Sequence, residues 1–154
     1  MGRINRAAVS VLRGHTDVVM RVTWSPEGRL LATESEKGTV IIWDVIAGTV
    51  KHVLEAAGSD ILRGKFVAMA WRPDGCVLAI GGAPGIVTLW DVTTGKQIRH
   101  IEHPMWGVVT AVAWSPCGRL LLVDTRNRPC DMPFEKSGFA VVVETRVFCV
   151  DHNM

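Results

Sequence analysis

The chain is built on a repeating unit of forty-seven residues. The segment from Trp24 to Gly48 recurs without a gap from Trp71 to Gly95. A third start, from Trp114 to Leu121, repeats the first eight residues of that unit at every position except Cys117. A single unit of this kind cannot bury its own apolar faces, so it must pack against neighbouring copies. The repeat therefore predicts a radial or stacked architecture.

The pattern inside each unit predicts four β-strands. Apolar residues alternate before each repeat tryptophan, as at Val22 and Trp24, which is the period of a half-buried strand. The Ser-Pro-Glu-Gly and Pro-Asp-Gly steps that follow are turn sequences, because proline presets φ and glycine accepts a positive φ. The remaining strands are expected at 30–33, 39–45 and 50–54, and at 77–80, 86–92 and 97–101. Short turns throughout make each unit an antiparallel sheet.

These motifs resemble the WD-repeat family of β-propellers, in which each four-stranded sheet is one blade around a central channel. The likeness rests on Gly14-His15, on the Trp-Ser-Pro-x-Gly turn, and on Trp43-Asp44 twenty-eight residues after the histidine. It implies an all-β fold made of an incomplete, open arc of about three blades. The stretch from Met69 to Gly81 is also similar to the propeller of the anaphase-promoting complex platform subunit, a ubiquitin ligase component.

The resemblance also implies a set of structural residues. In the family, a histidine, a Ser or Thr of the second strand, an Asp of the next turn and the Trp form a hydrogen-bonded set. Here His15, Ser35 and Trp43 match that set, Lys37 stands at the Asp position, and only Trp90 remains in the second copy. We therefore expect these blades to depend more on packing than on this network. The expected repeat residues are His15, Ser35, Trp43, Asp44, Trp90, Asp91, Trp24, Trp71 and Trp114.

The domain prediction is a single WD-repeat domain over residues 1–154. Its parts are a leading strand of an incomplete blade at 8–12, blade 1 at 15–54, blade 2 at 66–101, and a degenerate blade 3 at 108–150 with an insertion at 124–137. In the third blade, Val143 is expected at the Trp position and Glu144 at the Asp position. The alternative makes everything after Thr125 an unrelated tail.

Three blades are too few for a ring, since propellers typically close with about four to eight. Three explanations remain open: an open arc, a fragment of a longer product, or an oligomer whose arcs complete one another. Unpaired strand edges at the ends of an arc favour pairing with another chain.

Charge and hydropathy argue against several classes of protein. The net charge is +2 over 154 residues, with both signs interspersed, so we expect no intrinsic nucleic-acid binding. No apolar run reaches the roughly 18 residues of a membrane span, and the start lacks the apolar core of a signal peptide. We expect an intracellular protein, cytoplasmic or nuclear, without membrane attachment. The four cysteines show no close pairing and no metal-ligand spacing, so reduced thiols are expected.

No motif predicts an enzyme, a metal or a cofactor. His100 and His103 are three residues apart in a predicted strand, an arrangement that turns the two rings to opposite faces. No phosphate-binding loop, nucleophile elbow or Cys-His dyad occurs in a recognisable context. Asp44 and Asp91 recur together with the repeat tryptophan, which marks them as parts of the repeat and not as paired catalytic acids.

Met105 and Trp106 lie in the segment that joins the second unit to the third. Trp and Met are enriched at protein interfaces, so these residues either contact a partner or fold back onto the blade edge. The sequence predicts a non-catalytic scaffold that mediates protein–protein interactions, in a multiprotein complex, with self-association through open blade edges as a further expectation. The alternatives are a subunit or fragment of a ubiquitin ligase platform, a truncated propeller without independent function, and a propeller-based enzyme.

Overall fold

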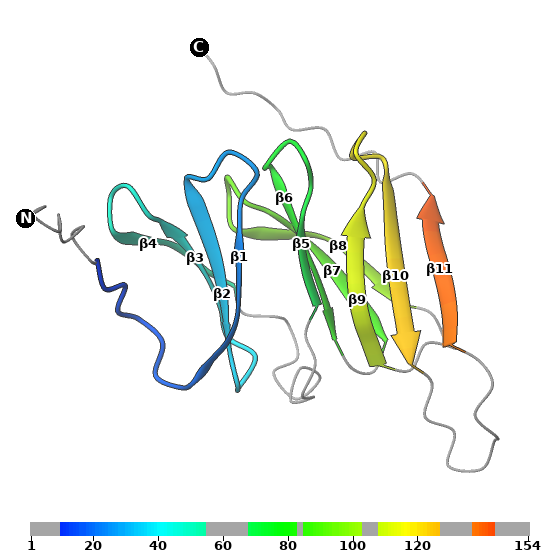
Figure 1. Cartoon of the computed structure of the whole chain (residues 1–154), viewed down its shortest axis with the longest axis horizontal. Coiled ribbons are helices and arrows are strands. Elements are labelled where there is room, and N and C mark those ends of the chain that lie inside the picture. The colour runs from blue at the N-terminus through cyan, green and yellow to red at the C-terminus, as the bar shows by residue number, and fades with distance from the viewer. Residues whose placement is uncertain (1–9, 55–67, 83–84, 103–107, 127–136, 144–154) are drawn as a thin grey trace, which may run out of the picture.

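Three antiparallel sheets lie side by side in a computed structural model of the chain (Figure 1). The structure describes residues 10–54, 68–82, 85–102, 108–126 and 137–143. All eleven elements in this part of the chain are strands. The all-β fold, with four-stranded antiparallel sheets in an open arc, is therefore confirmed.

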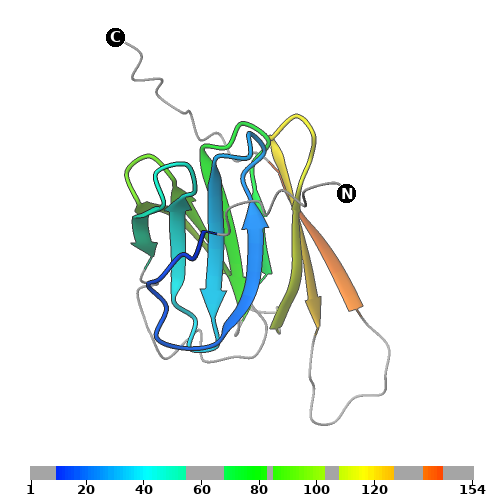
Figure 2. The same cartoon turned by 60° about the vertical axis from the view of Figure 1, so that its left-hand side comes forward.

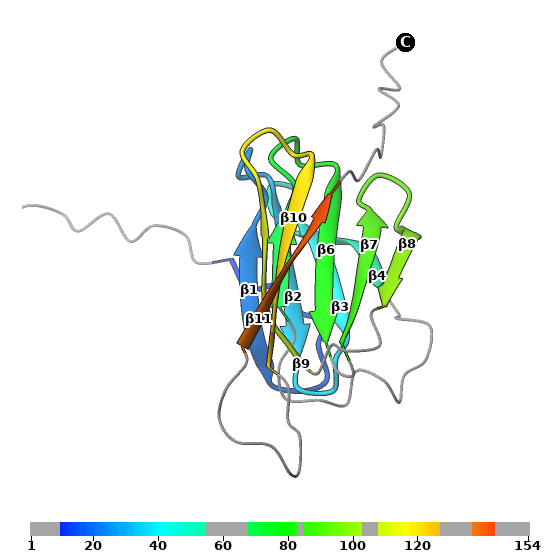
Figure 3. The same cartoon turned by 90° about the vertical axis from the view of Figure 1, so that its right-hand side faces the viewer.

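Each sheet follows the order of its strands in the sequence, and we call the sheets blades 1, 2 and 3. Blade 1 contains β1 (Val19–Trp24), β2 (Leu30–Ser35), β3 (Val40–Asp44) and β4 (Thr49–Leu54). Blade 2 contains β5 (Ala68–Trp71), β6 (Val77–Gly82), β7 (Ile86–Asp91) and β8 (Lys96–Glu102). Blade 3 contains β9 (Val108–Trp114), β10 (Leu120–Arg126) and β11 (Ser137–Val143), in the order β11-β10-β9. Figure 3, seen from the blade 3 side, shows the sheets one behind another.

The repeat also sets the turns. Gly28, Gly75 and Gly118 occupy the same place in the first hairpin of each blade, with φ of 72°, 74° and 68°. An L side chain is strained at such a φ, so glycine is the residue that closes these turns at little cost. The same hairpin geometry then places each following strand in the same register.

The third blade differs from the sequence alignment in two details. β10 continues to Arg126, so it extends into the predicted insertion. Leu121 pairs with Val142, whereas the equivalent Leu31 pairs with Trp43. Val142 therefore stands at the Trp position, one residue before the predicted Val143. A gapped alignment cannot fix this register, because a stretch of consecutive valines fits either choice.

The leading segment also departs from its prediction. Within the expected strand at 8–12, residues 10–12 form no strand, and residues 8 and 9 lie outside the described part. The dark blue segment that precedes β1 instead passes across the outer face of blade 1 (Figure 2). A Cβ built on Gly14 would lie 2.8 Å from the Cη2 atom of Trp43. The backbone thus lies directly on this indole, which is an approach that only glycine permits.

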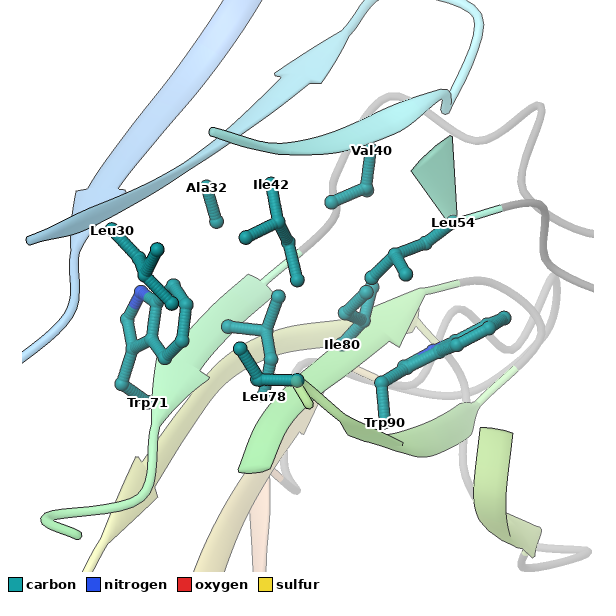
Figure 4. Packing of buried hydrophobic residues seen from close by; sticks show 10 residues of the cluster. Leu30, Ala32, Val40, Ile42, Leu54, Trp71, Leu78, Ile80 and Trp90 are labelled. Carbon is teal, nitrogen blue, oxygen red and sulfur yellow. The ribbon is translucent and has the colours of Figure 1, made fainter. Parts of the chain in front are cut away.

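The core consists of two apolar layers, one between each pair of neighbouring blades. In the first layer, side chains of β2, β3 and β4 meet those of blade 2 (Figure 4). Its residues are Leu30, Ala32, Val40, Ile42, Leu54, Trp71, Leu78, Ile80, Trp90 and Val92. The second layer joins blades 2 and 3 through Ala68, Val77, Ala79, Val87, Leu89, Val109, Leu121 and Val123. Each blade is thus stabilised chiefly by the next, as expected for stacked repeats.

Gly81 sets the distance between blades 2 and 3. A Cβ at this position would lie 2.5 Å from Cγ1 of Val109 and 3.3 Å from Cγ1 of Val112. Both valines belong to β9, the first strand of the next blade. The absence of a side chain at Gly81 therefore allows the close approach of the two sheets.

Candidate protein-binding face

In blades 2 and 3, a tryptophan at the end of the first strand joins the blade to the one before it. Nε1 of Trp71 donates to the carbonyl of Thr23 at 3.2 Å. Nε1 of Trp114 donates to the carbonyl of Ala70 at 3.1 Å. Thr23 and Ala70 are equivalent residues, since each immediately precedes the repeat tryptophan of its own blade. The two bonds therefore form one repeated contact between blades.

Trp24 is the equivalent tryptophan of blade 1, and no described sheet lies in front of it. Its side chain is 55% exposed, compared with 8% for Trp71. The same comparison holds two residues earlier, where Val22 is 63% exposed while its counterparts Met69 and Val112 pack against the core layers. We call the side of β1 that carries Val22 and Trp24 the open face of blade 1.

Further apolar side chains extend the open face along the same edge. Val18, Val19 and Met20 are also exposed, and all lie in or directly before β1. Soluble proteins seldom leave contiguous apolar surface uncovered unless it binds something. The described residues form such a surface here, at the end of the arc, because the repeat places core-type residues on a face that no other described sheet covers.

Next to the open face, where Thr33 pairs with Val22, a hydrogen-bonded group anchors Trp43, but its hydroxyl is not the predicted one. Nε1 of Trp43 donates to Oγ1 of Thr33 at 2.8 Å, and Nε2 of His15 lies 2.6 Å from the same oxygen. Ser35, the residue predicted for this role, is buried, and its hydroxyl has no hydrogen-bond partner among the described residues. Strand register explains the difference, because Thr33 pairs with Ile41, two residues before Trp43.

Blade 2 keeps this anchor by moving the hydroxyl to the opposite strand. The position equivalent to Thr33 is Ile80, and the one equivalent to Ile41 is Thr88. Nε1 of Trp90 donates to Oγ1 of Thr88 at 3.0 Å, and Ile80 pairs with Thr88 across the sheet. The Thr–Ile pair has therefore exchanged strands while the indole keeps a hydroxyl acceptor. Neither threonine was predicted from the sequence. The signal that could have found them is the position two residues before each Trp, which is occupied by Thr88 in blade 2 and is paired with Thr33 in blade 1.

The aspartates after Trp43 and Trp90 close the turn into the fourth strand. Asp44 accepts hydrogen bonds from the backbone N–H groups of Ile46 and Ala47, at 3.1 and 3.0 Å, and Asp91 does the same for the equivalent turn. The Ala47 N–H and the Arg29 guanidinium lower the pKa of Asp44. These contacts are those of turn-capping residues.

At the Asp position of the family set, Lys37 forms an ion pair with Asp17. The hydrogen bond from Lys37 lowers the pKa of Asp17. The Lys37 side chain is exposed and that of Asp17 is half-buried, and the pair ties the loop after His15 to the turn between β2 and β3. Burial lowers the pKa of His15, which favours the neutral form of its ring beside Thr33.

Glu34 is a buried carboxyl, and its only ion pair among the described residues is with Arg21, at 3.7 Å. Burial raises its pKa from 4.5 to about 7, against the opposing effect of the Arg21 charge. Between these two pH values the folded protein binds more protons than the unfolded chain does. The free energy of unfolding therefore falls as the pH rises through this window.

Replacing this carboxyl with an uncharged amide should remove that pH dependence. We expect Glu34→Gln to match the wild type in thermal midpoint at pH 4.5 and to exceed it at pH 8, because only the wild type must ionise a buried group. Thermal unfolding across this range measures the effect. Glu36→Gln, at an exposed carboxyl, should follow the wild-type profile. Parallel curves for Glu34→Gln and the wild type would contradict the assignment.

Several other predicted features are outside the described residues or differ from expectation. Met105, Trp106 and His103 are outside the described part, and there is no group of three or more metal-ligating side chains within it. Cys76 is disulfide-bonded, which contradicts the expectation of reduced thiols throughout, whereas Cys117 is free and exposed. Nowhere in the described ranges is there a helix with the length and apolar character needed to cross a membrane.

Comparison with known families identifies the repeat. Residues 6–44 match the family model "WD domain, G-beta repeat". Residues 58–106 match the model "Anaphase-promoting complex subunit 4 WD40 domain". The first match covers β1 to β3 of blade 1 and the second covers blade 2, and each includes a Trp-Asp pair.

Individual relatives match over single stretches. A chromatin assembly factor 1 subunit from Mus musculus is 40% identical over 48 residues, which is 31% of this chain and 8% of that protein. Small ribosomal subunit protein RACK1z from Arabidopsis thaliana is 43% identical over 47 residues, which is 30% of this chain and 14% of that protein. The matched region thus spans a small part of each relative.

A solved structure shares the fold over a larger region. The crystal structure of RRP9 WD40 repeats superposes with a TM-score of 0.63 and 20% sequence identity, over 73% of this chain and 34% of that chain. At this identity the likeness concerns the fold. Together with the two family matches and the repeated tryptophan contacts, it identifies the chain as a partial WD-repeat β-propeller with an open arc of blades.

Proposed function

We propose that this chain is a non-catalytic scaffold that binds other proteins through the open face of blade 1. The observation that carries the proposal is the contrast between Trp24, which is 55% exposed, and its repeat counterpart Trp71, which is 8% exposed. A residue type that elsewhere in the chain is buried between sheets is here presented to solvent. Tryptophan and methionine surrounded by aliphatic side chains make up the chemistry of a protein interface core.

The names of the relatives support this reading. One is a subunit of a chromatin assembly factor and another is a small ribosomal subunit protein, so both are components of larger assemblies. By analogy this chain works within a multiprotein complex inside the cell, in the cytoplasm or the nucleus, without a nucleic-acid or membrane partner of its own. Met105 and Trp106 are proposed as a second contact for a partner.

A second candidate function is a role in a ubiquitin ligase platform. It is supported by the match of residues 58–106 to the WD40 domain of anaphase-promoting complex subunit 4. Under this proposal the blades would dock ligase subunits in place of partners of another kind. The two candidates differ in the identity of the bound proteins and share the same binding face.

Site-specific photo-crosslinking in cells tests both proposals. A photoreactive amino acid placed at Val22 should yield covalent adducts with another protein chain. The same group at Ile46, which is 80% exposed in the turn between β3 and β4, serves as the matched control and should yield few. Ligase subunits among the adducts would favour the second candidate. Equal yields at the two positions, or none at position 22, would refute a binding role for this face.

A further inference from the structure

We propose that the open face of blade 1 is covered by blade 3 of a second copy of this chain, so that two arcs join head to tail. The inference rests on the proposed scaffold function, whose binding face it assigns to one partner. In this pair, Nε1 of Trp24 donates to the backbone carbonyl of Ala113 of the second copy.

The repeated tryptophan contact defines what Trp24 must meet. At both junctions within the chain, the indole N–H reaches the carbonyl of the residue before the preceding repeat tryptophan, Thr23 in one case and Ala70 in the other. In blade 3 the equivalent residue is Ala113, which directly precedes Trp114 and is exposed. Among the described residues, the indole N–H of Trp24 at one end of the arc and the carbonyl of Ala113 at the other thus lack the contact that their counterparts make.

The apolar surfaces at the two ends are complementary in the same way. On blade 1, Leu30 and Ala32 are 7% and 0% exposed because blade 2 covers them. Their counterparts on blade 3, Leu120 and Leu122, are 36% and 38% exposed. At the first junction, Trp71 and Leu78 pack in the same apolar layer as Leu30 and Ala32. The two leucines on blade 3 therefore offer the same kind of surface to a further blade. The face of blade 3 that carries Leu120 and Leu122 is therefore complementary to the face of blade 1 that carries Val22 and Trp24.

Head-to-tail pairing also closes the assembly. The described residues of each copy form three sheets, so those of two copies supply six, within the roughly four to eight blades that propellers use. A two-fold axis makes the two new junctions identical, which lets a head-to-tail contact end in a closed pair and not in an open filament.

The solution mass of the purified full chain, measured by light scattering at about 100 µM, tests this proposal. We expect a particle of twice the 16.8 kDa chain mass. Val22→Glu and Leu122→Glu each place a charge in both junctions of a pair, and each should weaken dimerisation more than tenfold. Trp24→Phe removes the indole N–H and keeps most of the apolar volume, and it should weaken dimerisation by about two- to tenfold. Ile46→Glu is the control with an unchanged mass, and circular dichroism verifies that all variants fold.

Mixing the two glutamate variants distinguishes head-to-tail pairing from its alternatives. A mixed pair retains one unaltered junction, so Val22→Glu and Leu122→Glu together should form heterodimers that neither forms alone. If two open faces of blade 1 met each other, Leu122→Glu would stay dimeric and the mixture would restore nothing for Val22→Glu, which overturns the proposal. A monomeric wild type or an open-ended polymer also overturns it. If the wild type is monomeric while Val22 still crosslinks to other proteins, the scaffold function stands and this inference fails.

Discussion

Replacement of Trp71 with alanine should lower the free energy of unfolding by about 3–5 kcal/mol. The indole is 8% exposed and lies in the apolar layer between blades 1 and 2, near Leu30 and Leu78 (Figure 4). Its removal leaves a cavity in the layer that joins the two sheets. It also leaves the carbonyl of Thr23 without its donor.

Urea unfolding monitored by far-ultraviolet circular dichroism at a fixed protein concentration measures this loss. Trp71→Phe separates the two contributions, because it keeps most of the apolar volume and removes the N–H group. We expect this variant to lower the free energy of unfolding by about 1–2 kcal/mol, because it loses one hydrogen bond and a small part of the side-chain volume. Equal losses for the two variants would show that the hydrogen bond, and not packing, dominates this junction.

Thr33→Ile should lower the free energy of unfolding by about 2–4 kcal/mol. The substitution removes the oxygen that accepts from Nε1 of Trp43 and that lies 2.6 Å from Nε2 of His15. Trp43 is 2% exposed, so its N–H cannot find water in place of the lost partner. A buried donor without an acceptor costs about 1–3 kcal/mol, and the second polar atom on His15 adds to that cost.

Blade 2 indicates how this loss can be repaired. There the isoleucine lies on the second strand and the threonine on the third, as Ile80 and Thr88. The double variant Thr33→Ile/Ile41→Thr copies that arrangement and should recover about 1–2 kcal/mol relative to Thr33→Ile, because Trp43 regains a hydroxyl acceptor. His15 regains nothing, so recovery is incomplete.

A double-mutant cycle with Ile41→Thr alone isolates the coupling between the two positions. Contacting residues couple by about 0.5–3 kcal/mol, and we expect a favourable coupling in this range from urea unfolding of all four proteins. Ser35→Ala is a matched control, since the Ser35 hydroxyl is buried with no partner among the described residues and its loss should cost little. A large cost for Ser35→Ala, together with additive effects at positions 33 and 41, would contradict this assignment. It would indicate that Ser35, the residue that the family resemblance implies, accepts the hydrogen bond from Trp43.

Local sequence patterns predicted the blade correctly. The alternation before Trp24 and Trp71, the glycine turns and the Trp-Asp pairs are features of a few adjacent residues, and the strands form at those places. The hydrogen-bonded group was less accessible to sequence reasoning, because its hydroxyl is chosen by pairing across strands. Thr33 rather than Ser35 binds Trp43 since the register places Thr33 beside Ile41.

The repeat by itself determined the strand order, the turn residues and the tryptophan positions, because these depend on short-range periodicity and on the φ preferences of proline and glycine. Only the tertiary structure decided which copies of equivalent residues are buried. Trp24 and Trp71 are the same residue in the same local pattern, yet one is exposed and the other covered. Burial depends on the neighbouring sheet, and a local pattern contains no information on whether that sheet is present.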